Sequence, residues 1–161
     1  MSFSVPKEFE AELDEMATHY PQKRSASLMF LHAVQERFGC ISPEAMDWIA
    51  AKLELQPMNV YELVTFYPMF RQEPVGKFQI KVCRTLSCAL GGSHALRDYF
   101  CEKLGLNAAE HGPQTTKDGK FTVEFVECLA SCGTAPVMMC NEDFYEGVSP
   151  EKANEILEKC R

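Results

Sequence analysis

The chain has 161 residues, of which 46% are apolar and 24% are charged. This length and composition suit a globular protein of one or two domains with a sizeable core. The net charge is -7 and the Lys and Arg residues are scattered, whereas nucleic acids and anionic membranes select basic patches. The N-terminus lacks a basic segment followed by an apolar run, and no stretch is long enough to span a bilayer. We therefore expect a cytoplasmic chain with no nucleic-acid partner and no direct membrane span.

The first 70 residues carry helical patterns. Apolar residues at helical spacing predict four helices, over residues 6–20, 24–38, 43–53 and 57–66. Ser42 is a good N-cap because its hydroxyl accepts a hydrogen bond from the first turn, and Pro43 fits the first helical position. The pattern predicts an N-terminal helical bundle over residues 1–70.

Aromatic residues and methionine gather at the end of this bundle, which makes it a candidate docking surface. They are Tyr61, Phe66, Tyr67, Met69 and Phe70. Packing in the core of the bundle is the alternative, because aromatic residues at helical spacing usually face inward. Docking by the helical domain is the working hypothesis.

Residues 71–76 contain Pro74 and Gly76 and are predicted to form a linker. The pattern after it predicts a β-α-β-β-α order, in which the last helix begins at Ser149 and Pro150. The expected strands cover residues 78–82, 121–127, 137–140 and 144–146, and the first helix covers residues 93–104. We therefore predict a two-part α+β chain whose second part, residues 77–161, is a thioredoxin-like α/β domain.

Four of the eight cysteines form two close pairs, Cys83 with Cys88 and Cys128 with Cys132, and each pair directly follows a predicted strand. Thiolates are soft ligands that favour iron-sulfur clusters or zinc. A helix beginning at Ser93 would direct its N-terminal dipole toward the first pair, where thiolates carry negative charge. The spacing predicts a centre ligated by these four thiolates.

A 2Fe-2S cluster is the favoured occupant, and structural zinc is the alternative because zinc also takes four cysteines. Zinc usually stabilises small folds without a core, whereas this half has its own apolar strands and helices. Thiol-disulfide catalysis is disfavoured because the chain has no Cys-x-x-Cys. A Rieske centre requires two histidine ligands, and neither cysteine loop contains any of His19, His32, His94 and His111. Of these, His94 is nearest to a cysteine loop.

The other cysteines lack a partner at ligand-like spacing. They are Cys40, Cys101, Cys140 and Cys160. In a chain without an export signal such cysteines are expected to be free, buried thiols. Gly91-Gly92 is an isolated glycine pair without the G-x-G-x-x-G pattern of a dinucleotide site. A nicotinamide or flavin cofactor should therefore bind a partner subunit.

These features resemble the 24 kDa subunit of respiratory complex I, known in bacteria as the E subunit. The resemblance is carried by the two cysteine pairs and by three segments: Val64-Thr65-Phe66-Tyr67-Pro68-Met69-Phe70, Pro74-Val75-Gly76-Lys77 and Glu127-Cys128-Leu129. It extends over nearly the whole chain. In that family a helical domain precedes a thioredoxin-like domain that holds one 2Fe-2S cluster.

The resemblance implies that Cys83, Cys88, Cys128 and Cys132 ligate a 2Fe-2S cluster, and that no residue here acts in acid-base catalysis. It implies an electron-transfer subunit of proton-translocating NADH:quinone oxidoreductase, which docks on the subunit that carries FMN and NADH. The expected location is the cytoplasmic peripheral arm of an inner-membrane complex, with further peripheral-arm subunits as neighbours. Because hydride transfer moves two electrons together, the isolated chain is not expected to oxidise NADH.

Two other functions remain as alternatives. The first is the same module in a soluble NAD-linked hydrogenase, formate dehydrogenase or electron-bifurcating complex. The second is a zinc-stapled interaction module. One residue departs from the family pattern, since the family usually has glycine two residues after the third ligand and this chain has Ala130. Gly133 is expected to supply the flexibility instead.

Overall fold

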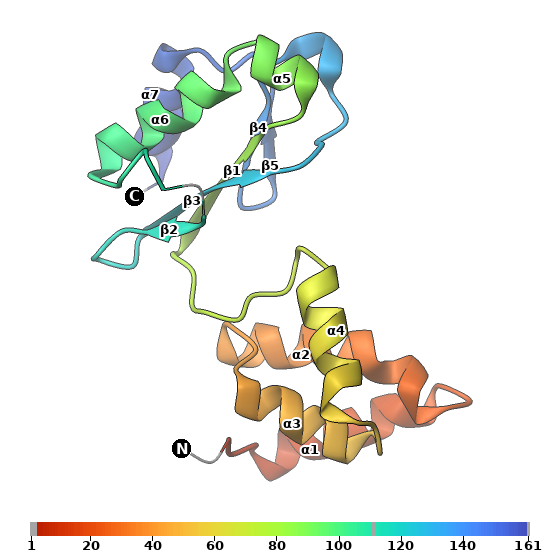
Figure 1. The fold of residues 1–161 in the computed structure, drawn as a ribbon. Helices are drawn as coiled ribbons and strands as arrows, with labels where there is room; N and C mark the ends of the chain where they lie inside the picture. Colours follow the sequence, from red (N-terminus) through yellow and green to blue (C-terminus); the bar gives the residue numbers. More distant parts are fainter. Residues whose placement is uncertain (1–2, 111, 161) are drawn as a thin grey trace. The chain divides into compact units, whose positions relative to one another are not determined.

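The computed structural model describes residues 3–110 and 112–160. Contacts between Cα atoms divide the chain into two compact units, Met1–Pro74 and Val75–Arg161 (Figure 1). The first unit is helical, and the second combines a sheet with helices. Both parts of the predicted α+β fold class are therefore present.

The helical unit contains the four predicted helices and one short 3-10 helix. They are α1 (Lys7–Thr18), η1 (Lys23–Ala26), α2 (Ser27–Phe38), α3 (Pro43–Lys52) and α4 (Pro57–Phe66). Ser42 caps α3 as predicted, because its Oγ accepts a hydrogen bond from the Ala45 backbone N–H at 3.2 Å. Gly39 ends α2 in the left-handed conformation, with φ of 83°, which glycine adopts without steric strain.

Each helix of this unit contributes apolar side chains to one core. Its fully buried members include Leu13, Phe30, Leu31, Val34, Ile49 and Val60. The aromatic residues predicted to form a docking surface divide between this core and the surface. Phe70 is buried and Tyr67 is partly buried in the core, whereas Tyr61, Phe66 and Met69 are exposed.

The described part of the second unit contains five strands and three α-helices. They are β1 (Phe78–Cys83), α5 (Leu86–Leu90), α6 (Ser93–Leu104), β2 (Gln114–Thr115), β3 (Phe121–Val126), β4 (Met138–Cys140), β5 (Asp143–Tyr145) and α7 (Pro150–Lys159), with a 3-10 helix η2 (Cys132–Thr134) between β3 and β4. The predicted elements are present. The short α5 and the edge strand β2 are additions that the sequence analysis did not predict.

α6 begins at Ser93, as predicted, and Gly92 takes the cap position with φ of 96°. The Ser93 side chain is buried, and its Oγ has no hydrogen-bond partner among the described residues. The last helix follows the prediction, because Ser149 Oγ accepts a hydrogen bond from the Lys152 backbone N–H at 3.3 Å.

The five strands form one mixed sheet in the order β2-β3-β1-β4-β5. β1 and β3 are parallel neighbours in which Cys83 pairs with Val126, and the remaining pairings are antiparallel. α6 connects β1 toward β3, and it packs on both strands and on α7 (Figure 1). Since parallel strands end at the same edge of a sheet, the segments that follow Cys83 and Val126 leave the sheet side by side.

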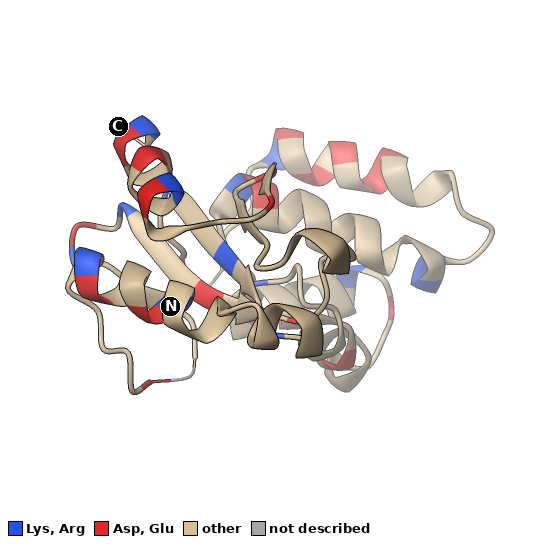
Figure 2. Ribbon diagram, turned by 90° about the horizontal axis from the view of Figure 1, so that it is seen from above, with Lys and Arg blue, Asp and Glu red and all other residues tan. Residues whose placement is uncertain are grey.

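Among the described residues, none of the helices has the length and apolar character needed to cross a bilayer. Figure 2 shows Lys and Arg interspersed with Asp and Glu along the helices. In the described parts of the chain, basic residues are therefore not gathered on a single element as a nucleic-acid-binding surface would require.

Candidate metal centre

The ends of β1 and β3 bring the two cysteine pairs to one edge of the sheet. Cys83 is the last residue of β1, and Cys128 follows the last residue of β3 by two positions. The Arg84 backbone N–H donates to the Val126 carbonyl at 3.0 Å, so the parallel pairing continues into the first residue after the strands. The regular sheet thus fixes where both cysteine segments begin.

The first pair, Cys83 and Cys88, is buried, with 2% of each residue exposed. Both side chains pack with Val137 in a small apolar cluster, and the Cys83 backbone N–H donates to the Val137 carbonyl at 3.1 Å. Cys88 lies within α5. The sequence analysis treated the segment of the first pair as a loop, but residues 86–90 form the short helix α5, which holds Cys88 in the apolar cluster.

The pKa values of the two buried thiols are shifted in opposite directions. Burial disfavours the Cys83 thiolate, but bonds from the Leu129 and Thr85 backbone N–H groups and from the Cys88 thiol together lower the pKa of Cys83. Burial is the largest cause that raises the pKa of Cys88, and the neighbouring Cys83 and Cys132 raise it further. The hydrogen bonds in this pair therefore favour the thiolate form at Cys83 more than at Cys88.

The second pair, Cys128 and Cys132, is exposed. Its segment is irregular apart from η2, which begins at Cys132. The Ala130 backbone N–H donates to Cys128 Sγ at 3.3 Å, and Ala130 has φ of 60°. Ala130 itself takes the left-handed conformation, whereas Gly133 lies in η2 and does not adopt a positive φ. Ala130, and not Gly133, therefore takes the left-handed conformation in this segment.

A carboxylate from the β5 side of the sheet holds the second pair's segment. Ser131 Oγ donates to Glu146 Oε1, and Thr134 Oγ1 donates to the same oxygen at 2.6 Å. The hydrogen bond from Ser131, followed by that from Thr134, lowers the pKa of Glu146. The Gly147 backbone N–H also donates to the Thr134 carbonyl at 2.7 Å. Glu146 and its neighbour thus give an irregular segment a defined position.

Contacts between the two segments bring the cysteine pairs together. The Leu129 backbone N–H is hydrogen-bonded to the Cys83 sulfur, and Cys132 lies close enough to Cys88 to influence its ionisation. Arg84 Nε donates to Glu127 Oε1 at 2.9 Å, which joins the residue after Cys83 to the residue before Cys128.

Gly91 permits the close approach of α5 to the segment after η2. A methyl group on Gly91 would lie 3.0 Å from Ala135 Cβ and 3.2 Å from the Ser87 carbonyl oxygen. In the described parts of the chain, no three His, Cys, Asp or Glu side chains form a group that could hold one metal ion.

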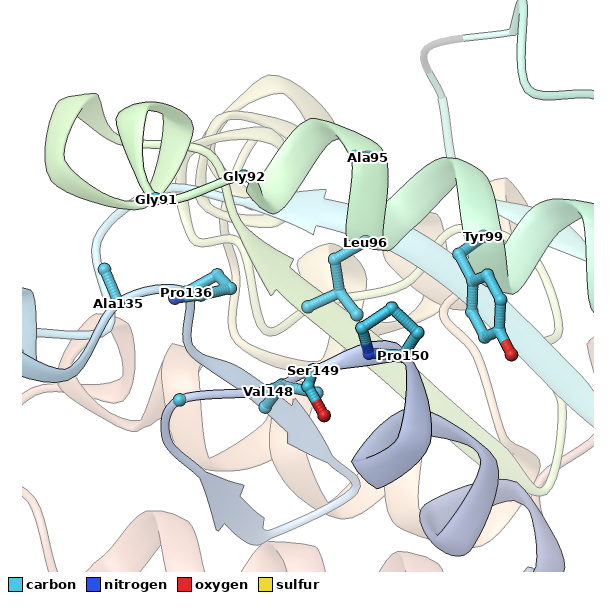
Figure 3. Close-up of a pocket in the computed structure, with 11 residues that line it drawn as sticks. Gly91, Gly92, Ala95, Leu96, Tyr99, Ala135, Pro136, Val148, Ser149 and Pro150 are labelled. Carbon is cyan, nitrogen blue, oxygen red and sulfur yellow. The ribbon is translucent and has the colours of Figure 1, made fainter.

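A cavity of about 540 Å³ opens beside these segments (Figure 3). Its lining includes Gly91 and Gly92 before α6, Ala135 and Pro136 after η2, and residues 147–150 before α7. The lining residues carry no charged side chain, and Tyr99 and Ser149 supply its polar side-chain groups. The cavity thus offers no charged side chain to a phosphate group.

The remaining residues singled out from the sequence lie elsewhere or in ordinary packing. His94 is exposed and its ring lies against Phe125, with ring centroids 5.0 Å apart. His32 lies in the helical unit against Phe70, at 4.9 Å. His19 is also in that unit, and His111 lies outside the described residues. Cys101 is buried in the core of the α/β unit, and Cys40 is partly buried.

Comparison with known proteins identifies the family. The model of the thioredoxin-like 2Fe-2S ferredoxin family matches residues 13–161. The chain belongs to the thioredoxin-like 2Fe-2S ferredoxin family. It is 38% identical over 157 residues to the E subunit of NADH-quinone oxidoreductase from Aquifex aeolicus (strain VF5), an alignment that covers 98% of this chain and 96% of the relative. It is 40% identical over 163 residues to the corresponding protein of Rickettsia bellii (strain RML369-C), with coverage of 99% and 95%.

Solved structures extend this likeness at the level of the fold. A crystal structure of an NAD+-reducing NiFe-hydrogenase in the H2-reduced state superposes with a TM-score of 0.64 at 20% identity. The match covers 81% of this chain and 22% of that chain, so this ferredoxin-family chain spans about a fifth of the hydrogenase chain. The similarity shows a shared fold.

The residues present fit the 2Fe-2S cluster that the family implies. A zinc ion needs four donors around a single centre, at about 2.3 Å for sulfur. A 2Fe-2S cluster instead takes two cysteines on each of two irons. Two thiols on each of two neighbouring segments can supply two ligands to each iron. Cys83 with Cys88 and Cys128 with Cys132 are the residues of this ferredoxin-family chain that would hold the group.

Sequence reasoning missed the side chains that position the second pair. Glu146 is separated from Ser131 by 15 residues, and it looks like any acidic residue at the end of an edge strand. Arg84 and Glu127 carried a weak signal, because each directly adjoins a candidate ligand and their charges are opposite. Their pairing follows from the parallel register of β1 and β3, which the sequence pattern alone does not define.

Proposed function

We propose that this chain is the electron-transfer subunit of an NADH:quinone oxidoreductase, complex I, and that Cys83, Cys88, Cys128 and Cys132 hold its single 2Fe-2S cluster. The observation that carries the proposal is the meeting of two cysteine pairs at the shared edge of β1 and β3. Near-full-length identity of 38% to the Aquifex aeolicus protein supports the assignment to this assembly.

The cluster would supply one-electron transfer to and from a neighbouring cofactor. NADH gives up two electrons together as hydride, so a flavin must stand between nicotinamide and this chain. We place FMN and NADH on a partner subunit, and the four cysteines act here only as ligands. Oxidation of NADH by the isolated chain is not part of this function.

We expect the flavin-bearing partner to approach from the side of the exposed pair. Cys128 and Cys132 are exposed, whereas Cys83 and Cys88 are buried, so a redox partner reaches the site most closely over the second pair. The adjacent α5 exposes two leucines at i and i+4, with Leu86 71% and Leu90 82% accessible. Exposed apolar side chains beside exposed ligands support a binding surface for the partner.

The helical unit contributes a second docking surface in this proposal. α4 buries Val60 and Val64 in the core of the unit, yet its outer face exposes Met58, Tyr61 and Phe66. A helix that is apolar on both faces is normally covered on both. Methionine and aromatic residues are also enriched in protein interfaces. The exposed face of α4 therefore supports docking of the helical unit on the same assembly. In this proposal the chain lies in the cytoplasmic peripheral arm, beside the other peripheral subunits.

Purification of the native assembly tests the proposal. We expect this chain to co-purify with a flavin-bearing subunit and peripheral-arm subunits of complex I, and to contain iron and labile sulfide in equal amounts. Anaerobic NADH should then produce the EPR signal of a reduced 2Fe-2S centre in the complex, but should leave the visible spectrum of the isolated, flavin-free chain unchanged. Dithionite should reduce both samples.

Other results would identify the alternatives. Co-purification with hydrogenase, formate dehydrogenase or electron-bifurcating subunits would assign the chain to a soluble NAD-linked assembly. A colourless native protein with stoichiometric zinc would identify a zinc-stapled interaction module. Rapid reduction of the flavin-free chain by NADH would contradict the division of labour between this chain and its partner.

The docking surface is tested separately by charge substitution at an exposed position. Leu90→Glu should weaken association with the flavin subunit by about tenfold or more while the visible spectrum of the isolated chain stays unchanged. Phe144→Glu is the matched control, because Phe144 is also an exposed apolar residue of the α/β unit, at 44% accessibility, but lies on β5. Equal loss of binding in both variants would contradict the placement of the partner over α5.

A further inference from the structure

Two cysteines that are not ligand candidates meet inside the α/β unit. Cys140 is the last residue of β4, and Cys160 caps the C-terminal end of α7. Their sulfur atoms lie 3.6 Å apart, and the residues are 5% and 6% exposed. The sequence separates them by the whole of residues 141–159, so the fold brings together two thiols that spacing alone gave no reason to pair.

We propose that Cys140 and Cys160 form a disulfide when the protein meets a low-molecular-weight disulfide such as oxidised glutathione. The sulfur atoms must approach by about 1.5 Å to reach the roughly 2.05 Å of a disulfide bond. Cys160 lies at the C-terminal end of its helix, where we expect a small adjustment of backbone and side chains to close this distance. This inference concerns thiols outside the candidate metal centre and is independent of the proposed function.

The reaction is a pair of thiol-disulfide exchanges. One protein thiolate attacks a sulfur of the small disulfide, which forms a mixed disulfide and releases one small thiol. The second protein thiol loses its proton and attacks the mixed disulfide, which forms the Cys140–Cys160 bond and releases the second small thiol. Two protein thiols are thereby oxidised, and the small disulfide takes both electrons and both protons.

The surroundings of the pair make this oxidation slow. Burial, followed by the neighbouring Cys160 and Asp143, raises the pKa of Cys140 to about 12. The thiolate is the attacking species, and it is scarce at neutral pH when the pKa is high. Both residues are also almost fully buried, so a small disulfide reaches either sulfur only when the structure opens locally, and we expect reaction over a time on the order of an hour.

The disulfide would enclose a segment that adjoins the candidate metal centre. Residues 141–159 include Glu146, which accepts hydrogen bonds from Ser131 and Thr134. They also include residues 147–150 of the cavity lining (Figure 3). Cross-linking Cys140 to Cys160 would therefore tie the end of α7 to the sheet and restrict the segment that positions the exposed cysteine pair.

The test uses the full-length, cluster-loaded protein incubated with excess oxidised glutathione for several hours. We expect peptide mapping after alkylation to identify a Cys140–Cys160 cross-link, with the visible spectrum retained. The midpoint of thermal unfolding of the α/β unit should rise on the order of 10 °C, because the bond closes a loop of about 20 residues in the unfolded chain. Dithiothreitol should reverse the cross-link and the rise together.

Two variants control the experiment. Cys160→Ala should lose both the cross-link and the rise in midpoint, and Cys140→Ala provides the same comparison if the first variant folds poorly. Cys101→Ala, which removes a buried thiol outside the pair, should retain both. Alkylation of both thiols after prolonged oxidation would overturn the proposal, and so would mixed glutathione disulfides without a cross-link, or preferential reaction of the four candidate ligands.

Discussion

The two cysteine pairs differ in how the fold holds them. Cys83 and Cys88 are buried on a strand end and a helix, so regular secondary structure and an apolar cluster fix their positions. Cys128 and Cys132 are exposed on an irregular segment, which is held by individual hydrogen bonds. Core packing therefore fixes the first pair of the candidate centre, whereas the second pair lies on an exposed loop.

This difference assigns separate tasks to the two pairs. A buried pair gives rigidity and excludes water, whereas an exposed pair allows a partner to approach. An exposed pair also lies on a segment that needs its own support, and Glu146 and the left-handed Ala130 provide it here. The comparison predicts that changes at the buried pair affect folding and ligation together, whereas changes at the exposed pair affect mainly ligation.

Serine substitution of the proposed ligands gives the largest expected effect. Each of the four Cys→Ser variants should lose most of its bound iron and sulfide, because a thiolate ligand is replaced by a much weaker hydroxyl. Metal analysis and EPR of the reduced protein measure this loss. Cys40→Ser is the control and should retain full cluster content.

The same variants separate the two pairs when the metal-free chain is unfolded with urea. Cys88→Ser should lower the free energy of unfolding by about 1–3 kcal/mol, because it buries a hydroxyl in an apolar cluster. Cys132→Ser should change it by no more than about 0.5 kcal/mol, because this side chain is exposed. Equal destabilisation by both variants would contradict the contrast between a core-like and a loop-like pair.

Gly91→Ala tests the packing that brings the pairs together. The added methyl group would lie 3.0 Å from Ala135 Cβ and 3.2 Å from the Ser87 carbonyl, so α5 and the segment after η2 must separate. We expect a loss of about 1–3 kcal/mol in the free energy of unfolding, together with reduced cluster content. Gly133→Ala is the matched control, because a methyl group there meets no atom within 4 Å. An equal free energy of unfolding and equal cluster content in the two variants would contradict a role for Gly91 in this packing.

The sequence predicted the beginnings of both cysteine segments well, because alternating apolar residues define β1 and β3 and each cysteine pair follows a strand. It also predicted the cap at Ser42, whose hydroxyl accepts the expected hydrogen bond, and the start of the last helix at Ser149 and Pro150. These features depend on residues close in sequence, where local propensity and capping chemistry decide the structure.

The missed features depend on short elements or on distant contacts. α5 has five residues and β2 has two, which is too short for an apolar period to show. The contact of Cys140 with Cys160 spans 20 residues, and it exists only because α7 packs back on the sheet. Sequence spacing therefore identified the candidate ligands but not the residues that position them.

Glu146→Gln tests the support of the exposed pair. A neutral amide accepts weaker hydrogen bonds from Ser131 and Thr134 than a carboxylate does, so the second segment should open more often. We expect the rate of cluster loss to an iron chelator at neutral pH to rise on the order of threefold. Glu142→Gln, in the exposed turn between β4 and β5, is the control and should leave this rate unchanged.

The pH dependence of this support follows from the direction of the shift. The pKa of Glu146 is lowered in the folded chain below its ordinary value of 4.5. The stabilisation that the Glu146 carboxylate gives to the folded chain is therefore complete above pH 4.5. It is lost as the pH falls through the lower pKa of the folded state. In the metal-free chain, wild type should lose stability relative to Glu146→Gln over this acidic range, and a constant difference between the two would contradict the role of the carboxylate.

The smallest expected effect is at Ala130, where the chain accepts backbone strain to place one N–H group. With φ of 60°, Ala130 bears the steric strain of a left-handed L-residue, roughly 1–2 kcal/mol, from which glycine is exempt. Glycine also loses more backbone entropy on folding, by roughly 0.5–1 kcal/mol. Ala130→Gly should therefore raise the free energy of unfolding by about 0.5–1 kcal/mol in urea titrations.

Ala130→Val should lower the free energy of unfolding, because a branched side chain fits this conformation worse. The Ala130 backbone N–H donates to Cys128 Sγ in this conformation. A glycine variant that is less stable than wild type would show that the left-handed turn is not the conformation that holds the exposed pair.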